Sequence, residues 1–572
     1  MGIANHPPAG PGNPEYFRGP GLSPSLPWSG EGGSRAGAPD RAIRAGRLQR
    51  RRAAHVLAGG TSLYRAAAIG AFLVLPAGLV AAQNPVAVAG RYADRNAAAV
   101  IAELRELLSI PNVASDGPNI RRNAEALVAM LEKRGVKARI LESAGPPVVY
   151  GEIGDASLPT VLFYCHYDGQ PADASRWQQT TPWTPVLRTA SIEKGGIAVE
   201  HWPDPGEAVD PEWRIYARSA SDDKAPIIAL MAMLDAWREA GTPLRNRLKF
   251  MFEGEEEASS PHLADVVRVN RALLAADLVV MADGPIHPTG RPTADFGLRG
   301  MATVTLTMYG PLSPLHSGHY GNWAPNPAMR LAQLLATMKG PDGEILVGGW
   351  DDDVAPIGPA ERAAWDRYPH DDPERRLQLQ LGSLDGGGAH RMELIARPSL
   401  NVRGLQSLFV GDQARTLIPD VAIAELDLRL VDGNQPERQV EKLRRHIEKQ
   451  SYVVVASVPD SAVRVNTPRL VRMTAGDGYP AGRTPLDTPA ASALIAALAG
   501  AGLGEPVVSP TMGGSGPAWV FTDILGAPFA ALPTVNHDNN QHAANENIRI
   551  ANLLNAARIL AAAASAAIRP VQ

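Results

Sequence analysis

Apolar residues follow two different spacings in the first half of the chain, and the two spacings alternate. Helical spacing predicts helices at residues 93–109, 120–134, 224–240 and 261–275. Short apolar runs predict strands at residues 137–141, 148–153, 160–165, 213–218, 247–252 and 277–282. Strands that alternate with helices are typical of an α/β domain, in which a mostly parallel sheet is flanked by helices. Ligands in such domains lie beyond the carboxyl ends of the strands.

The pattern changes at about residue 295. Strands are expected at residues 301–309, 400–410, 421–431 and 462–466, and helices at residues 326–338 and 436–449. This order predicts an α+β domain in which two helices cover one face of a four-stranded sheet, as in ferredoxin-like folds. Residues 340–398 are rich in Asp, Gly and Pro, and we expect a long loop with some helix there.

The first 82 residues carry no pattern that could build a core. Residues 1–55 are rich in Pro, Gly, Ala and Arg, and we expect them to be disordered or not translated. Residues 66–82 form an apolar run that ends in small residues, which is the pattern of a secretory signal with cleavage after Ala82. A retained membrane anchor is disfavoured because the run is short and contains glycines and a proline. The sequence therefore predicts a periplasmic or secreted protein with no stable membrane anchor after cleavage.

Composition narrows the class of protein. The 572 residues are 45% hydrophobic and 20% charged, as in soluble globular proteins of two or three domains. A formal net charge of -4 leaves no strongly basic surface, which argues against nucleic acid as a partner. The single cysteine, Cys165, excludes an internal disulfide and a cysteine-based zinc cluster. Any bound metal must therefore be held by His, Asp and Glu.

The strand expected at residues 160–165 ends in residues that suit metal binding. His166 and Asp168 come directly after it, and side chains two apart on an extended segment point to the same side. Asp168 could accept a hydrogen bond from one ring nitrogen of His166 while the other nitrogen binds a metal. Taken alone, the pair is explained as readily by a surface turn or a capped histidine.

Three further expected strands also end in acidic residues. These residues are Asp222, Asp223, Glu253, Glu255, Glu256, Glu257 and Asp283. Each group alone could be a helix cap, a solvated loop or a turn. Gathered at one end of one sheet, so many carboxylates would repel each other unless cations lay among them. The pattern therefore predicts a site for divalent metal.

Six features occur in a characteristic order along the chain. They are His166-Tyr167-Asp168-Gly169-Gln170-Pro171, Ser221-Asp222-Asp223-Lys224, Glu253-Gly254-Glu255-Glu256-Glu257, Asp283, Leu315-His316-Ser317-Gly318 and His542-Ala543-Ala544-Asn545-Glu546. Over residues 95–568 the chain resembles the co-catalytic di-zinc metallopeptidases, the family of carnosinase, bacterial dipeptidases, glutamate carboxypeptidase, aminoacylase and succinyl-diaminopimelate desuccinylase. The resemblance implies a zinc-exopeptidase-like catalytic domain in two parts, 93–294 and 506–568, with a lid and dimerisation domain inserted at 295–505.

The resemblance also implies roles for single residues. The metal ligands would be His166 and Asp283 for one ion, Glu257 and His542 for the other, and Asp222 as the bridge. Asp168 would orient His166, and Glu256 would be the general base. His316 would reach across a homodimer interface to the substrate carbonyl. The cofactors would be two divalent metal ions; Zn suits the ligand set best, with Mn and Co as alternatives.

The assignment depends on which glutamate of the run from Glu255 to Glu257 faces the metal and which faces the water. Adjacent residues diverge on an extended backbone, so Glu257 can face a metal while Glu256 faces water. Two metals a few ångströms apart can share a water and lower its pKa, and a neighbouring carboxylate can take the proton. Glu255 remains an alternative for either role.

Two features of the later sequence concern the substrate. Arg429 lies on the polar face of an expected strand, where it could pair with a neighbouring acid, whereas the resemblance favours a clamp for the substrate carboxylate. Gly514 and Ser515 lie in a glycine-rich segment that resembles the family's substrate-binding loop. Thr511 and Met512 stand where carnosinase-like dipeptidases carry an Arg-Glu pair. This departure concerns the contact with the substrate and removes no metal ligand.

Together, the residues and the resemblance imply a metallopeptidase that hydrolyses the amide bond of dipeptides or short peptides with a free carboxyl end. An N-acyl or N-carbamoyl amino acid amidohydrolase would use the same metals and base, and it remains an alternative. A catalytically inactive peptide-binding protein would be expected to lack Glu256 or a ligand, and every expected position is filled.

Overall fold

The computed structural model of the protein describes residues 84–178 and 181–569. The expected leader, the signal sequence and the cleavage site at Ala82 lie outside these residues. Among the described residues, no helix combines the length and the apolar character that a membrane span requires.

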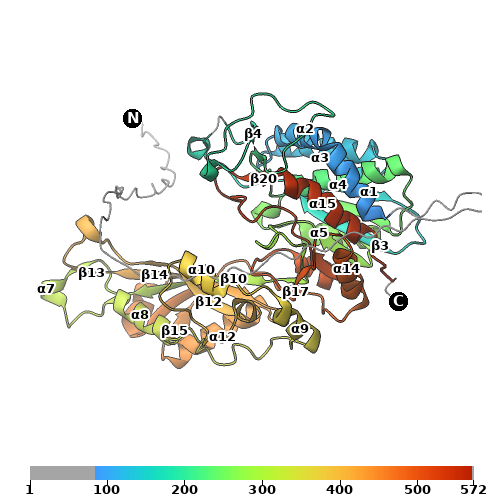
Figure 1. Cartoon of the computed structure of the whole chain (residues 1–572). Helices are drawn as coiled ribbons and strands as arrows, with labels where there is room; N and C mark the ends of the chain where they lie inside the picture. The colour runs from blue at the N-terminus through green and yellow to red at the C-terminus, as the bar shows by residue number, and fades with distance from the viewer. Residues whose placement is uncertain (1–83, 179–180, 570–572) are drawn as a thin grey trace, which may run out of the picture. The chain divides into compact units, whose positions relative to one another are not determined.

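An eight-stranded sheet forms the centre of the first domain (Figure 1). In spatial order its strands are β1 (Lys137–Leu141), β2 (Val148–Ile153), β6 (Arg247–Glu253), β3 (Thr160–His166), β7 (Leu278–Met281), β19 (Phe529–Ala531), β8 (Thr293–Asp295) and β18 (Val507–Ser509). The central strands β6, β3, β7 and β19 run parallel, whereas β1 and β2 join by antiparallel pairing. The expected mostly parallel sheet is confirmed.

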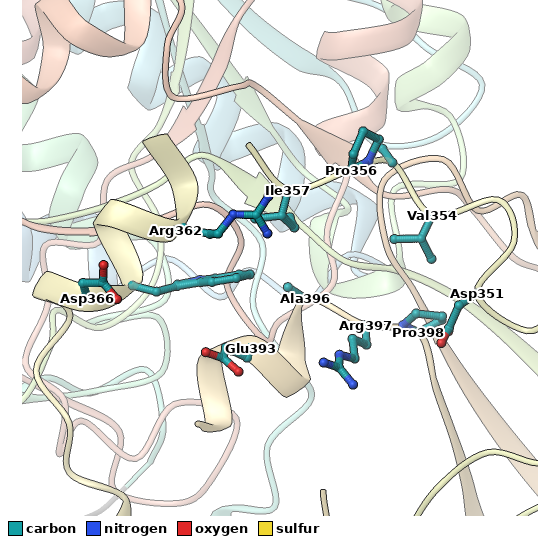
Figure 2. Close-up of a pocket in the computed structure, with 12 residues that line it drawn as sticks. Asp351, Val354, Pro356, Ile357, Arg362, Asp366, Glu393, Ala396, Arg397 and Pro398 are labelled. Carbon is teal, nitrogen blue, oxygen red and sulfur yellow. The ribbon is translucent and has the colours of Figure 1, made fainter. Parts of the chain in front are cut away.

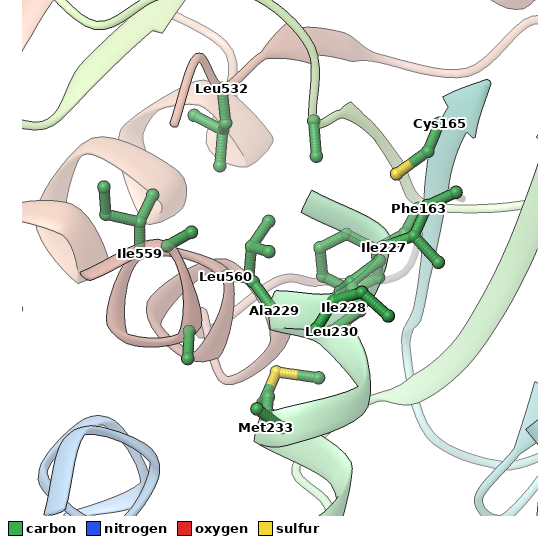
Figure 3. Packing of buried hydrophobic residues seen from close by; sticks show 14 of the residues in the cluster. Phe163, Cys165, Ile227, Ile228, Ala229, Leu230, Met233, Leu532, Ile559 and Leu560 are labelled. Atoms are coloured by element: carbon green, nitrogen blue, oxygen red, sulfur yellow. The ribbon is translucent and has the colours of Figure 1, made fainter. Parts of the chain in front are cut away.

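Side chains of β3 alternate between two hydrophobic cores, because successive residues of a strand point to opposite faces. Phe163 and Cys165 lie in the first core, and Leu162 and Tyr164 lie in the second. The first core is covered by α1 (Pro85–Arg95), α2 (Ala97–Leu108), α4 (Lys224–Ala240) and α15 (Ile550–Ala564). Figure 3 shows α4 and α15 packed side by side in this core, with Leu560 near their contact. The buried position of Cys165 fits a packing role.

The second core is covered by shorter segments. They are α5 (Leu263–Val269), α6 (Arg271–Leu274) and the π-helix η5 (Val520–Leu525). On the other side of the domain, α3 (Gly117–Glu132) packs against β1 and β2. The sheet is therefore flanked by helices on both faces, and its carboxyl edge is left open for a site.

Two expected helices are interrupted in the structure. The helix expected at 93–109 is α1 followed by α2, and the helix expected at 261–275 is α5 followed by α6. α1 begins earlier than expected, at Pro85, because the side chain of Asn84 accepts a hydrogen bond from the Val86 N–H at 2.9 Å and caps the helix. Apolar spacing runs through the breaks at Asn96 and Asn270, so the spacing alone could not locate them.

One expected strand does not join the main sheet. β5 (Arg214–Tyr216) lies between β4 (Val186–Arg188) and β20 (Asn547–Arg549) in a separate three-stranded sheet. The expectation that Asp222 and Asp223 follow a strand of the main sheet is therefore wrong. The two residues still reach its carboxyl edge, because they directly precede α4, which packs against β3.

The second domain contains a five-stranded sheet rather than the expected four strands. Its spatial order is β12 (Ser399–Gln406), β14 (Val421–Leu430), β10 (Gly300–Tyr309), β16 (Leu470–Ala475) and β15 (Val453–Val455). The helices α8 (Pro327–Ala336) and α12 (Pro436–Lys449) contribute to the same core beneath the sheet. The predicted α+β arrangement with two helices is confirmed.

Residues 462–466 are not the expected strand. They belong to the short helix α13 (Ser461–Asn466), and the fourth strand is instead β16. The cause is local, since the side chain of Asp460 accepts a hydrogen bond from the Val463 N–H at 2.8 Å and caps a helical turn.

The long segment at 340–398 contains three short helices, as expected in part. They are α9 (Pro359–Arg367), α10 (Asp372–Gln378) and α11 (Arg391–Ile395). The return to the catalytic domain comes earlier than the boundary at 505, because α14 (Pro489–Ala499) packs in the first core against α15. Just before it, β17 (Gly482–Arg483) pairs with β9 (Gly297–Leu298), where the chain leaves that domain.

Candidate metal centre

His166, at the carboxyl end of β3, lies in a buried acidic cluster. Its Nε2 is 2.8 Å from Oδ1 of Asp222 and 4.0 Å from Oδ2 of Asp283, which comes after the neighbouring strand β7. The possible ligand atoms of His166, Asp223 and Asp283 all lie within 4.8 Å of one another. The carboxyl ends of adjacent parallel strands therefore bring the two predicted ligands His166 and Asp283 together, as the sequence predicts.

A second group of possible ligands adjoins the first. Nε2 of His542 lies 3.0 Å from Oδ2 of Asp222 and 3.1 Å from Oε2 of Glu257. The possible ligand atoms of Asp222, Glu257 and His542 also fall within 4.8 Å of one another. Asp222 touches both histidines, one with each carboxylate oxygen, so it lies between the two groups. The structure thus brings together all five side chains that the sequence predicted as ligands.

Two amides to which the sequence analysis assigned no role hold these carboxylates. Nε2 of Gln170 donates to Oε2 of Glu257 at 2.9 Å, and Nε2 of Gln541 donates to Oδ2 of Asp222 at 2.9 Å. Each glutamine is a close neighbour in sequence of a predicted site residue, Gln170 of Asp168 and Gln541 of His542. That proximity was the available signal, although it does not say which carboxylate each amide contacts.

Asp168 contacts both the histidine and the glutamate run. Its Oδ1 lies 3.4 Å from Nδ1 of His166, and its carboxylate accepts hydrogen bonds from the N–H groups of Glu256 at 3.1 Å and Glu257 at 3.0 Å. The side chain is fully buried. Asp168 therefore lies beside the ring of His166 and holds, by hydrogen bonds, the backbone that carries the next two site residues.

The structure separates the three consecutive glutamates. The carboxylate of Glu255 pairs with Nδ1 of His262 at 2.9 Å and accepts a hydrogen bond from the His262 N–H at 3.0 Å. Glu256 instead lines the cavity that contains Asp222, and Glu257 contacts His542. Glu255 is thus turned away from the cluster, which favours Glu256 as base and Glu257 as ligand.

The clustered charges shift one another's protonation. Burial and the nearby charge of Asp222 raise the pKa of Asp283 to about 7. Burial also raises the pKa of Glu256 well above its ordinary value. Hydrogen bonds to Asp222 and Glu257 raise the pKa of His542 to about 10. Burial acts to raise the pKa of Asp222 as well, but its hydrogen bonds with the two histidines outweigh burial and hold that pKa low.

These residues fit two divalent cations. The donor set of imidazole nitrogens and carboxylate oxygens is one that Zn, Mn and Co accept. Oδ1 of Asp223 is buried and has no hydrogen-bond partner among the described residues. Carboxylates packed this closely raise one another's pKa unless positive charge lies among them, and for Asp283 this repulsion adds to the larger effect of burial.

A cavity of about 370 Å³ opens on the cluster. Its lining residues include Asp222, Glu256, Asp283 and His542 together with Gly514 and Ser515 of the returning segment. Nη1 of Arg429 donates to Oγ of Ser515 at 2.6 Å, and its Nε lies 3.3 Å from Oδ2 of Asp427. Arg429 therefore pairs with a neighbouring acid, as one interpretation holds, and it also contacts the glycine-rich segment. Its role as a clamp for the substrate carboxylate stays a prediction.

His316 lies apart from this cavity within the single chain. It belongs to β11 (Leu315–His316), which pairs with β13 (Leu417–Ile418), and its side chain is exposed. Its Nδ1 accepts a hydrogen bond from the Gly318 N–H at 3.0 Å. His316 is not among the residues that line the cavity at the metal cluster.

A larger cavity, of about 580 Å³, lies in the inserted segment. Figure 2 shows it between α9, which carries Arg362 and Asp366, and α11, which carries Glu393. None of the predicted ligands or substrate-binding residues lines it. Size alone would therefore point to the wrong place, whereas the grouping of ligand side chains identifies the smaller cavity as the candidate site.

Known proteins with similar sequences act on peptides. The model of the family described as Peptidase family M20/M25/M40 matches residues 162–566. Over 374 residues the chain is 28% identical to the Cys-Gly metallodipeptidase dug1 of Schizosaccharomyces pombe, a match that covers 62% of this chain and 74% of that protein. It is 26% identical over 423 residues to the Beta-Ala-His dipeptidase of Homo sapiens, covering 73% and 76%.

The fold is also found in solved structures. An M20 family metallo-carboxypeptidase of Sulfolobus solfataricus matches with a TM-score of 0.66 and 28% identity, covering 82% of this chain and 98% of that one. The matched residues 162–566 include every predicted ligand and the base. By its sequence, its fold and its buried ligand cluster, the chain is a metallopeptidase that belongs to peptidase family M20/M25/M40.

Proposed function

We propose that this metallopeptidase hydrolyses the amide bond of dipeptides or short peptides with a free carboxyl end. The observation that carries the proposal is the position of Glu256, which lines the same cavity as Asp222, Asp283 and His542. The names of the relatives, a Cys-Gly metallodipeptidase and a Beta-Ala-His dipeptidase, support a dipeptide as the substrate.

Two divalent metal ions are the proposed cofactors. His166 and Asp283 would hold one ion, Glu257 and His542 the other, and Asp222 would serve both. When bound, such ions polarise a substrate carbonyl and lower the pKa of a water. Zn is the first candidate because histidine and carboxylate ligands suit it, and Mn and Co accept the same donors.

The reaction requires a base beside the scissile bond, and Glu256 is the proposed one. Its raised pKa makes the ionised carboxylate a stronger base, which favours removal of a proton from the attacking water. The same carboxyl group can then give the proton to the leaving nitrogen. Asp168 supports this role because it binds the backbone N–H of Glu256 and keeps the side chain at the cavity wall.

We propose that the free carboxylate of the substrate binds at the side of the cavity formed by the glycine-rich segment. Arg429 carries a planar guanidinium that suits a carboxylate, and Ser515 is already within its reach. Gly514 leaves the backbone of this wall open to close approach. Met512 also lines this cavity, and with Thr511 it replaces the Arg-Glu pair of carnosinase-like dipeptidases.

Glu256→Gln tests the proposal directly. We expect the variant to keep its bound metal and to lose most of its turnover, because the amide cannot accept the proton of the water. Release of free amino groups from a panel of dipeptides measures the turnover, and elemental analysis measures the metal. Glu255→Gln is the matched control and should stay active, since that side chain pairs with His262. A Glu256→Gln enzyme with a rate near that of the wild type would show that the base lies elsewhere.

A second reaction shares the same machinery. An N-acyl or N-carbamoyl amino acid also presents an amide bond beside a free carboxylate, and Thr511 and Met512 remove one argument for a carnosinase-like substrate. The same panel distinguishes the two if N-acyl amino acids are included. Faster hydrolysis of these compounds than of any dipeptide would make the amidohydrolase the better description.

The protein is proposed to act as a homodimer in the periplasm or outside the cell. The apolar run at 66–82 supports export. Exposed apolar residues on the edge strand β12 and just after it support association; they are Val402, Leu405, Phe409 and Val410. A dimer would also give the exposed His316 a place to act, namely the active site of the partner.

A further inference from the structure

Glu546 is a buried carboxylate that the proposed reaction does not use. It is fully buried, and it lies four residues after His542 on the segment that returns to the metal centre. Its only ionic partner within the described chain is Arg218, whose Nη1 lies 2.7 Å from Oε2 of Glu546. A buried carboxylate is costly unless its oxygens are fully hydrogen-bonded, so its contacts indicate what it stabilises.

Both oxygens of Glu546 accept hydrogen bonds from one loop. Oε1 accepts from the N–H and the hydroxyl of Ser221 and from the N–H of Asp222, each at 3.0 Å. Oε2 accepts from Nη1 of Arg218 at 2.7 Å and from the N–H of Ser219 at 3.1 Å. Five donors thus converge on one carboxylate, which leaves no oxygen free to bind a metal.

The loop that Glu546 binds needs such an acceptor. It joins β5 to α4, its residues Ser219 and Ser221 are fully buried, and Ser219 has a positive φ of 61°. Buried N–H groups without an acceptor destabilise a conformation, and a left-handed serine persists only where its surroundings enforce it. The carboxylate of Glu546 satisfies the N–H groups of Ser219, Ser221 and Asp222 at once.

We propose that Glu546 is a positioning residue that sets the carboxylate of Asp222 between the two groups of ligands. It binds the backbone of Asp222 from a segment that also carries His542, so one side chain couples the shared ligand to a ligand of the second group. The coupling spans 324 residues of sequence. This inference rests on the proposed role of Asp222 as a ligand of both metals.

Glutamine cannot replace Glu546 in this role. Four of the five partners are N–H groups, which can only donate. An amide would direct its own NH₂ group at the N–H groups that meet one of the two oxygens. At least one buried donor would then lose its acceptor, and the loop would relax away from the geometry that presents Asp222. Aspartate keeps both acceptors but is one methylene shorter, so it should restore part of the function.

The test compares Glu546→Gln and Glu546→Asp with the wild type and with Glu361→Gln. Glu361 is the matched control, because it is also buried and accepts a hydrogen bond from the N–H of Leu486 at 3.1 Å. It belongs to neither group of possible metal ligands. Metal affinity and stoichiometry are measured by titration of metal-free protein with Zn, and the ligand field by the absorption spectrum of the Co-substituted protein. Circular dichroism of the metal-free proteins reports folding.

We expect Glu546→Gln to fold, to bind Zn about tenfold or more weakly, and to show a changed Co spectrum. Glu546→Asp should fall between Glu546→Gln and the wild type, and Glu361→Gln should bind metal like the wild type. Wild-type affinity and an unchanged Co spectrum in Glu546→Gln would overturn the inference.

If Glu546→Gln does not fold, Ser221→Ala replaces it, because this change removes one of the five donors without altering charge. The expected result is a shifted Co spectrum and weaker binding, and a spectrum and affinity identical to the wild type would overturn the inference. A wild-type protein that binds no metal would overturn the proposed function itself, so the two failures are distinguishable.

Discussion

Glu255, Glu256 and Glu257 are identical side chains in consecutive positions, yet each has a different environment. Glu255 is held by His262, Glu256 lines the cavity, and Glu257 contacts His542. The short helical turn that begins at Glu256 rotates each residue relative to the one before. Chemical identity therefore does not decide the role of a residue here; the direction in which the backbone presents it does.

Glu253, at the end of β6, shows the energetic consequence of such an environment. Burial raises its pKa to about 8, although the hydroxyl of Tyr164 donates to it. The unfolded pKa is about 4.3, so this group contributes stability that is present below about pH 4.3 and lost as the pH rises through 8. We expect Glu253→Gln to lessen the fall in the free energy of unfolding between pH 5 and pH 8.5.

Urea unfolding of the metal-free proteins at these two pH values measures the effect. Each unit of pKa shift corresponds to about 1.4 kcal/mol. The fall in the free energy of unfolding between the two pH values should therefore be smaller in the variant than in the wild type by a few times that value. Glu200→Gln, at an exposed position, is the control and should behave like the wild type. Equal pH dependence in Glu253→Gln and the wild type would refute the assignment.

At the scale of elements, β12 is the feature that the single chain leaves unexplained. It is the edge strand of the five-stranded sheet, and its exposed residues include Val402 and Leu405. An unpaired edge with apolar side chains favours association with another chain, and natural proteins avoid it where no partner exists. The same domain carries the exposed His316, which the metal cavity of its own chain does not include.

If the proposed dimer forms through this edge, the double variant Leu405→Lys, Phe409→Lys should be monomeric, because two charges would be buried at the contact. Light scattering after size-exclusion chromatography measures the mass. Val269→Lys changes an apolar residue on α5 that is even more exposed and should leave the proposed association intact. A wild-type protein that is monomeric at micromolar concentration would contradict the proposed association.

At the scale of the whole molecule, the metal centre joins segments that are far apart in sequence. His166, Asp222, Glu257, Asp283 and His542 come from five separate segments, four of which precede the inserted domain and one of which comes after it. Bound metal would tie these segments together and would add its binding free energy to folding.

Removal of metal by a chelator should therefore lower the melting temperature. The gap between the melting temperatures of the metal-bound and the metal-free protein should widen from pH 6 to pH 8. Asp283, with a pKa of about 7, favours the metal-free fold below about pH 3.9 and loses that contribution as the pH rises through 7. His542, with a pKa of about 10, contributes fully below about pH 6.5 and loses the contribution as the pH approaches 10. Protons also compete with metal for both groups, so metal binds more tightly at higher pH.

Differential scanning calorimetry with chelator or with added Zn, at pH 6, 7 and 8, measures this gap. Addition of Zn, Mn or Co after chelation should restore both the melting temperature and turnover. A gap that stays constant or narrows with rising pH would contradict the ligand assignment.

The sequence by itself determined the local features of this protein. Runs and spacings of apolar residues located β1, β2, β3 and α4 within a residue or so, because burial of one face or of a whole strand imposes its period on the residues. Acidic residues and histidine at strand ends indicated the ligands, because the carboxyl ends of parallel strands meet at one edge of the sheet. The order of motifs then identified the family.

Only the tertiary structure decided which groups meet across the chain. It turned residues 462–466 into a helix, moved β5 out of the main sheet, and directed Glu255 to His262. It also brought Glu546 within hydrogen-bonding distance of a loop more than 300 residues earlier in the sequence. Such contacts depend on how distant segments pack. The spacing of apolar residues, with a period of two in strands or 3.6 in helices, carries no information about this packing.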